Sequence, residues 1–280
     1  MRARQSRNAR IDDGRARFAQ YEACALVGVL KKMRDGLMAS AYPEQCHVCG
    51  RAIQSYDDGV ACEDCWFDSA ITGMLDAPAC DKCGAALAAR QAALSGLCGM
   101  CSAFPFSAAR SCGAYSGALE ANILFLKSHP HICRRLREMI FRTFQNHRSA
   151  LESDVVVPVP LHRARERERG FNQATLIAKI IARKFNLRLD DRSLVRARST
   201  ERHRVGLDAV DRKKSVERAF TLTRPRLVEN LSVLLVDDLF TTGSTLSSAS
   251  QSLLKAGARR VNALTIARVE DRSRPLSLSQ

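Results

Sequence analysis

Apolar runs and amphipathic stretches alternate along the second half of the chain. Residues 155–159, 232–236 and 260–266 are short, mostly apolar runs, which is typical of buried strands. Residues 172–185 and 245–256 carry apolar side chains at helical spacing. Because strands alternate with helices, this part of the chain is predicted to form an α/β fold around a parallel sheet.

The hydrophobic pattern divides the chain into four segments. Residues 1–41 are basic and polar, and are predicted to be a disordered or weakly helical extension; a nucleic-acid-binding arm or a misassigned start is the alternative. Residues 42–106 hold paired cysteines and show little periodicity. Residues 107–270 form the predicted α/β domain, which includes a helical pattern at 133–144, and residues 271–280 are a tail.

Composition and charge limit the classes of protein to consider. The chain has 280 residues, of which 46% are hydrophobic, an ordinary share for a globular protein. No apolar run approaches the roughly 20 residues that a membrane span needs, and no signal-peptide pattern opens the chain. We therefore expect a cytoplasmic protein without a membrane span.

The formal charge of +15 is unevenly distributed. Residues 42–106 carry a charge of −5, whereas residues 158–220 carry 17 Lys or Arg against 8 Asp or Glu, a charge of +9. A strongly basic segment favours an anionic partner such as phosphate or nucleic acid. We expect that partner at the α/β domain rather than at the cysteine-rich segment.

Eight of the eleven cysteines form four C-x-x-C pairs, which are separated by 12, 14 and 14 residues. In a reducing compartment this pattern indicates metal binding rather than disulfides. Two pairs complete a tetrahedral Cys₄ zinc site, so four pairs predict two structural zinc ions. An iron–sulfur cluster and redox-active dithiols are the alternatives. The predicted ligands are Cys46, Cys49, Cys62, Cys65, Cys80, Cys83, Cys98 and Cys101.

The spacing leaves the pairing of the four knuckles open. Sequential pairing needs only short hairpins, but a cross-braced arrangement is also compatible with these distances along the chain. His47 lies inside the first knuckle and is predicted to face solvent rather than bind metal. Cys24, Cys112 and Cys133 have no C-x-x-C partner and are predicted to be small buried side chains.

A phosphate-binding pattern occupies residues 233–245, VLLVDDLFTTGST. An apolar strand runs into two carboxylates, Asp237 and Asp238, at the edge of the sheet where ligands of parallel α/β proteins bind. A loop rich in hydroxyl groups then opens a helix, and the amides of a helix N-terminus suit a phosphate. The loop residues are Thr241, Thr242, Gly243, Ser244 and Thr245.

This stretch resembles the signature with which type I phosphoribosyltransferases bind phosphoribosyl pyrophosphate (PRPP). The resemblance implies that Asp237 and Asp238 hold the ribose 2′- and 3′-hydroxyls and that residues 241–245 hold the 5′-phosphate. It also implies Mg²⁺ bound with PRPP. Purine-salvage members often carry an aspartate three residues after the acid pair as a general base, and this chain has Thr241 there.

Residues 155–173, VVVPVPLHRARERERGFNQ, extend the resemblance. Together with the cysteine pairs they resemble the ComF family, which includes GntX-type DNA-utilisation proteins, over roughly residues 44–268. This resemblance implies an N-terminal double zinc ribbon followed by a type I phosphoribosyltransferase fold, a parallel sheet flanked by helices. The resemblance places Arg163 and Arg169 against pyrophosphate, where the arginine fork suits two phosphate oxygens, with Asn172 and Gln173 starting the next helix. Residues 200–220 resemble the family's mobile hood loop.

Two functions follow from these resemblances. The first is Mg²⁺-dependent transfer of ribose 5-phosphate from PRPP to an unknown nitrogen acceptor. Asp237, Asp238, Arg163 and Arg169 are then the expected catalytic residues. The second is a non-catalytic PRPP-sensing or single-stranded-DNA-handling protein of the DNA-uptake pathway. The candidate partners are accordingly PRPP, single-stranded DNA and DNA-uptake proteins.

Overall fold

The computed structural model describes residues 44–53, 55–72, 78–87, 94–196 and 219–269. The predicted N-terminal extension, the tail at 271–280 and most of the predicted hood loop lie outside these residues. None of the helices in the described ranges combines the length and the apolar character that a membrane crossing requires.

The centre of the fold is a five-stranded sheet in which every pair of neighbours is parallel. The strand order is β1-β7-β6-β2-β3. In chain order the strands are β1 (Ala108–Ala114), β2 (Val155–Pro158), β3 (Arg188–Leu189), β6 (Ser232–Phe240) and β7 (Arg260–Arg268). All of β2 and the first five residues of β6 are buried, as expected for central strands covered on both faces.

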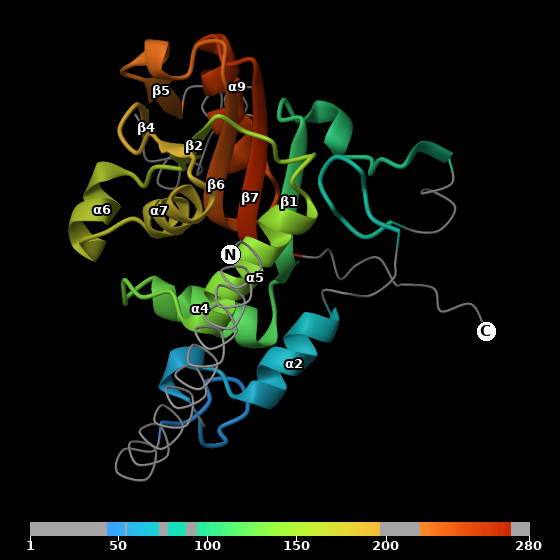
Figure 1. Ribbon diagram of the computed structural model, residues 1–280, viewed down its shortest axis with the longest axis vertical. Helices are drawn as coiled ribbons and strands as arrows, with labels where there is room; N and C mark the ends of the chain where they lie inside the picture. Colours follow the sequence, from blue (N-terminus) through green and yellow to red (C-terminus); the bar gives the residue numbers. More distant parts are fainter. Residues whose placement is uncertain (1–43, 54, 73–77, 88–93, 197–218, 270–280) are drawn as a thin grey trace, which may run out of the picture.

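Helices cover both faces of the sheet (Figure 1). Val156 and Leu234 point into a core shared with the helices on one face, whereas Val155 and Leu235 point into a core shared with α9 on the other. This follows from the alternation of side chains along a strand. The first face is covered by α4 (Gly117–Leu126), α5 (Arg134–Asn146) and α7 (Gln173–Phe185), and the second by α9 (Ser244–Lys255).

Smaller elements complete the described chain. The strands β4 (Leu194–Arg196) and β5 (Phe220–Leu222) form an antiparallel pair on the α9 face, where the Ser252 hydroxyl donates to the Phe220 carbonyl at 2.9 Å. The remaining helices are α2 (Glu63–Thr72), α6 (Arg163–Arg169) and the short 3₁₀ turns η1 (Tyr56–Asp58), η2 (Cys101–Ala103) and η3 (Pro225–Leu227).

The two halves of the cysteine-rich region lie apart (Figure 1). The first half, with α2, lies beneath α4, and the second half lies beside β1 at the edge of the sheet. The amide of Ala109 in β1 donates to the carbonyl of Lys82 at 2.7 Å, which joins the second half to the sheet edge. Each half therefore contacts a different part of the α/β domain.

The structure confirms the predicted fold class and most of the predicted elements. Helices α5, α7 and α9 begin and end within two residues of the predicted bounds. The structure also differs from the sequence-based expectations. The strand predicted at 232–236 continues four residues further as β6, so the acid pair lies inside the strand. Residues 163–169 form helix α6 and residues 108–114 form β1, and neither element was predicted.

Candidate functional site

The acid pair lies at the point in the sheet where the chain connections run in opposite directions from two neighbouring strands. The chain leaves β2 toward β3 on one side, and leaves β6 toward β7 on the other side. Parallel α/β proteins bind ligands at such a switch point, beyond the carboxyl ends of the strands. β2 ends at Pro158, opposite Val236, while β6 continues through Asp237 and Asp238 to Phe240. The two carboxylates therefore follow the last residue of β6 that pairs with β2.

Asp237 carries a charge that its surroundings disfavour. Burial and, next, the charge of Asp238 raise the pKa of Asp237 well above its usual range. The Asp238 amide donates to Asp237 Oδ1 at 2.9 Å, and the positive charge of Arg196 partly offsets the effect. Two neighbouring acids in a partly desolvated position suit a ligand that brings hydroxyl donors or a cation.

The loop after β6 presents hydroxyls and backbone amides. Gly243 is the N-cap of α9 with a positive φ of 76°, and it provides no side-chain cap for the first amides of the helix. The Thr242 hydroxyl donates to Ser244 Oγ at 3.0 Å and accepts from the Ser244 amide at 3.4 Å. Thr241 and Thr242 are exposed. This arrangement suits a phosphate group at the start of α9.

The loop between β2 and α7 contains the second predicted motif. Asn172 caps α7, since its side-chain Oδ1 accepts from the backbone amide of Ala174 at 3.0 Å. Its side-chain Nδ2 donates to the Val159 carbonyl at 2.9 Å. The predicted helix start is therefore present and is fastened to the end of β2. Asn172 and Gln173 are both buried.

The two arginines expected at pyrophosphate lie on α6. Arg163 opens this helix and is exposed, Arg169 closes it and is half-buried, and no residue of α6 is buried. In the described part of the chain, neither arginine makes an ion pair with Asp237 or Asp238. The structure thus gathers the acid pair and the hydroxyl loop directly, and places the arginines on a surface helix that follows β2.

The sequence patterns missed two side chains near the acid pair. Arg196, at the end of β4, lies close enough for its charge to act on Asp237. Tyr115 follows β1, and its pKa is raised by burial and by the charges of Glu120 and Asp238. Both residues come from distant parts of the sequence and belong to no motif, so no local signal could have identified them.

The eight paired cysteines form two four-sulfur clusters. Cys46, Cys49, Cys62 and Cys65 form the first, and Cys80, Cys83, Cys98 and Cys101 form the second; within each, all sulfurs lie within 4.8 Å of one another. The pairing is sequential, which decides between the two arrangements that the spacing allowed. All eight are free thiols rather than disulfides.

The sulfur–sulfur distances between the two pairs of each cluster fit a tetrahedral metal. Cross-pair sulfur distances are 3.6 and 3.8 Å in the first cluster and 3.4 and 3.6 Å in the second. Zn–S bonds of about 2.3 Å in a tetrahedron imply sulfur–sulfur distances of about 3.8 Å. Arg51 Nε donates to Cys49 Sγ at 3.4 Å and lowers the pKa of that thiol to about 6, which favours the thiolate that binds metal.

The remaining cysteines and His47 do not join these clusters. Cys133 is buried, as predicted, and its thiol donates to Asn122 Oδ1 at 3.5 Å, whereas Cys112 is half-buried. His47 is exposed, and its ring is T-shaped to that of Phe125, with centroids 6.4 Å apart. Cys24 lies outside the described residues.

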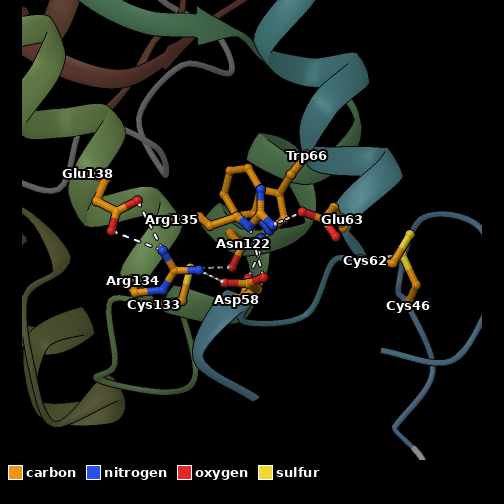
Figure 2. A network of polar contacts seen from close by, with 10 residues as sticks. All are labelled: Cys46, Asp58, Cys62, Glu63, Trp66, Asn122, Cys133, Arg134, Arg135 and Glu138. Atoms are coloured by element: carbon orange, nitrogen blue, oxygen red, sulfur yellow. Dashed lines mark hydrogen bonds and ion pairs between the residues drawn. The ribbon is translucent and has the colours of Figure 1, made fainter. Parts of the chain in front are cut away.

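A buried carboxylate fastens the first cysteine half to α5 (Figure 2). Asp58 accepts from Arg134 Nη2 at 2.7 Å and forms an ion pair with Arg135, whose Nε lies 2.8 Å from Asp58 Oδ2. The Asp58 carbonyl accepts from Trp66 Nε1 at 2.8 Å. Arg135 also pairs with Glu63 on α2 at 2.7 Å. The first cluster is therefore anchored to the helices that cover one face of the sheet.

Comparison with protein families matches both halves of this architecture. Residues 125–277 match the family model described as "Phosphoribosyl transferase domain". The chain belongs to the phosphoribosyltransferase domain family. Residues 37–116 match the "Double zinc ribbon domain" model, which agrees with the two Cys₄ clusters.

Curated relatives extend the resemblance to the ComF family. The chain is 36% identical over 115 residues to the DNA utilization protein YhgH of Escherichia coli K12, which covers 41% of this chain and 49% of that protein. It is 35% identical over 118 residues to competence protein ComFC of Bacillus subtilis, covering 41% and 44% respectively. It is 34% identical over 116 residues to competence protein F of Haemophilus influenzae, covering 41% and 50%. The aligned region spans about half the length of these relatives, and the predicted resemblance to the ComF family is confirmed.

Two solved structures align with part of this chain at low identity. Glutamine PRPP amidotransferase of B. subtilis covers 46% of the chain, and the chain covers 25% of that enzyme, at 23% identity and a TM-score of 0.33. Purine phosphoribosyltransferase of Pyrococcus horikoshii covers 49% of the chain, and the chain covers 84% of that enzyme, at 16% identity and a TM-score of 0.29.

Proposed function

We propose that the site at the carboxyl ends of β2 and β6 binds PRPP with Mg²⁺ and transfers ribose 5-phosphate to a nitrogen acceptor in the cytoplasm. One observation carries the proposal. The acid pair of β6 continues directly into a hydroxyl-rich loop whose glycine opens α9, at the switch point of a parallel sheet. The family match supports the same reading.

Each part of the site has a role in this proposal. Asp237 and Asp238 accept hydrogen bonds from the ribose 2′- and 3′-hydroxyls, which offsets the cost of the buried charge of Asp237. The loop from Thr241 to Thr245 and the first amides of α9 hold the 5′-phosphate. Arg163 and Arg169 on α6 provide positive charge for the pyrophosphate group. The carboxylate oxygens of the acid pair are also the donors that Mg²⁺ prefers.

The protein's contribution to the reaction is positioning and charge. The nitrogen of the acceptor attacks C1′ of the ribose, the bond from C1′ to pyrophosphate breaks, and pyrophosphate leaves with the bonding electrons. Bound Mg²⁺ would supply positive charge to the departing pyrophosphate. Fixing ribose and phosphate at two ends of one loop holds C1′ in place for attack, which lowers the entropic part of the barrier.

Two structural zinc ions are proposed at the cysteine clusters. In each cluster four sulfurs occupy all positions of a tetrahedral site, so these ions have no open position for catalysis. The first cluster lies in the core with α4 and α5, and the second lies in the core with α9. Metal at both sites would therefore stabilise contacts on both faces of the sheet.

A second function is favoured by one feature of the site. Thr241 stands where purine-salvage enzymes carry a carboxylate base, and α6 presents four arginines on a helix with no buried residue. A PRPP-sensing protein that handles single-stranded DNA or binds DNA-uptake proteins would use these features without turnover. The names of the curated relatives, competence and DNA utilization, support this alternative.

Pyrophosphate release distinguishes the two functions. The protein is mixed with Mg²⁺ and PRPP and assayed with a panel of amines and nucleobases, alongside Asp237→Ala/Asp238→Ala. Acceptor-dependent release that the double variant lacks supports transfer. PRPP binding with no release in any mixture supports sensing, and single-stranded DNA binding that weakens steeply with salt would then identify the DNA-handling function.

A further inference from the structure

An aromatic side chain from the second cysteine half packs directly on the proposed phosphate loop. A Cβ atom added to Gly243 would lie 2.7 Å from Cζ of Phe104 and 2.9 Å from Cε2 of Phe240. Real Cβ atoms do not approach other heavy atoms this closely, so the ring of Phe104 occupies the space beside the Gly243 Cα. The glycine is therefore required by a neighbour as well as by its positive φ.

Residues in both knuckles of the second cluster form hydrogen bonds with the backbone of Phe104. Its amide donates to the carbonyl of Cys101 at 3.3 Å, and its carbonyl accepts from Lys82 Nζ at 2.7 Å. Lys82 lies between the two cysteines of the other knuckle. The ring of Phe104 stacks on Phe106 with centroids 5.0 Å apart. The position of this ring is thus set by residues at the metal cluster.

A second connection joins the same cluster to the start of the loop. Arg268, the last residue of β7, donates from Nη1 to the Cys83 carbonyl at 2.8 Å. Its guanidinium lies 4.2 Å from the ring centroid of Phe240, the last residue of β6 before the loop. Arg268 is buried, which limits its freedom to move. The loop is therefore held between two contacts that both lead to the second cluster.

We propose that Phe104 is a positioning residue for the phosphate loop, and that the second cysteine cluster couples its metal state to PRPP affinity through Phe104 and Arg268. The inference rests on the proposed function, because it assumes that the loop from Thr241 to Thr245 binds the 5′-phosphate. Loss of metal from the second cluster releases the ring, and the loop then no longer presents its amides in one arrangement. The first cluster is attached to α5 through Asp58 instead and does not share this coupling.

The test compares Phe104→Ala and Phe104→Leu with two matched controls. Phe144→Leu truncates a buried aromatic side chain that packs on Phe185 in the core on the other face of the sheet, and Asp58→Asn loosens the first cysteine half. Calorimetry measures the affinity for Mg²⁺–PRPP, and hydrogen exchange measures protection of the loop in the free protein. We expect Phe104→Ala to weaken PRPP binding by about tenfold or more, because small displacements of binding groups are costly.

The other variants distinguish a positioning role from a general loss of stability. Phe104→Leu should recover part of the PRPP affinity that Phe104→Ala loses. Both controls should change the PRPP affinity by less than about threefold, even where they lower the melting temperature. Phe104→Ala should also speed up hydrogen exchange in the loop, and Cys98→Ser, which removes a metal ligand of the second cluster, should have the same effect. Gly243→Ala combined with Phe104→Ala should cost less than the sum of the two single changes, because removing the ring makes room for the new Cβ.

Failure of this inference is separable from failure of the proposed function. If the wild type binds PRPP and Phe104→Ala binds it equally well, Phe104 does not position the loop. If the wild type does not bind PRPP at all, the proposed function fails, and hydrogen exchange alone decides the coupling. Unchanged loop exchange in both Phe104→Ala and Cys98→Ser overturns it.

Discussion

Asp237→Asn should stabilise the free protein at neutral pH while it weakens PRPP binding. The substitution keeps the shape of the side chain and the oxygen that accepts from the Asp238 amide at 2.9 Å, so it changes little except the charge. Burial and the charge of Asp238 raise the pKa of Asp237, so its ionised form opposes folding. Removing that charge should therefore raise the free energy of unfolding. Binding sites often keep such destabilising groups because the ligand needs them.

The size of the gain follows from the partial exposure of the site. A fully buried uncompensated carboxylate would cost several kcal/mol, but Asp237 is only half-buried and Arg196 offsets part of the cost. We therefore expect the free energy of unfolding to rise by about 1 kcal/mol, within the range of common stabilising substitutions. For a domain of this size the melting temperature should rise by about 2–4 °C.

The pH dependence gives the sign of the effect. The pKa of Asp237 is higher in the folded protein than the value of about 3.9 expected in the unfolded chain. The protonated side chain does not destabilise the fold below pH 3.9, and the free energy of unfolding decreases as pH rises through the folded pKa. The difference between Asp237→Asn and wild type should therefore be small near pH 4 and largest at pH 8. Differential scanning calorimetry across this range, without Mg²⁺ or PRPP, measures it.

Asp238→Asn is the matched control. It removes the neighbouring charge but leaves the larger cause, burial of Asp237, in place, so it should stabilise less. A melting temperature that falls in Asp237→Asn at neutral pH, or a difference that does not grow with pH, would contradict a destabilising charge at Asp237. Stabilisation without any loss of PRPP affinity would contradict the role of Asp237 at the ribose.

Other changes test the supporting structure. Asp58→Ala deprives Arg134 and Arg135 of a shared buried carboxylate, and because both arginines are partly exposed the unfolding free energy should fall by about 2 kcal/mol in thermal denaturation; a loss below about 0.5 kcal/mol contradicts the network. Asn172→Ala removes the cap of α7 and should cost about 1–2 kcal/mol in urea denaturation, with Asn172→Asp between it and wild type. Metal analysis should find two zinc ions per chain and about one in Cys62→Ser; iron instead of zinc overturns the assignment.

Much of the fold could be predicted from the sequence because the decisive signals are local. The central strands β2 and β6 are buried on both faces and therefore appear as continuous apolar runs. The edge strand β1 contains small and polar residues, AARSCGA, and has no such signal. α6 buries none of its residues, so no hydrophobic periodicity marks it as a helix.

The site could be predicted only where its residues are adjacent in the sequence. The acid pair and the hydroxyl loop lie within one strand–loop–helix unit, and the cysteine knuckles have characteristic spacing. Contacts made by tertiary packing left no such trace. Phe104 meets Gly243 only after the second cysteine half folds against β1, and Arg196 reaches Asp237 only through the β4–β5 pair. The choice between sequential and cross-braced clusters likewise depended on folding in three dimensions.

Calorimetry of Mg²⁺–PRPP binding to wild type and to Asp237→Ala/Asp238→Ala decides whether PRPP binds at the acid pair of β6. We expect one PRPP bound per chain for the wild type, loss of binding in the double variant, and no loss of the two zinc ions in either protein. Absence of binding by the wild type, or equal binding by both proteins, would contradict a PRPP site at the acid pair of β6.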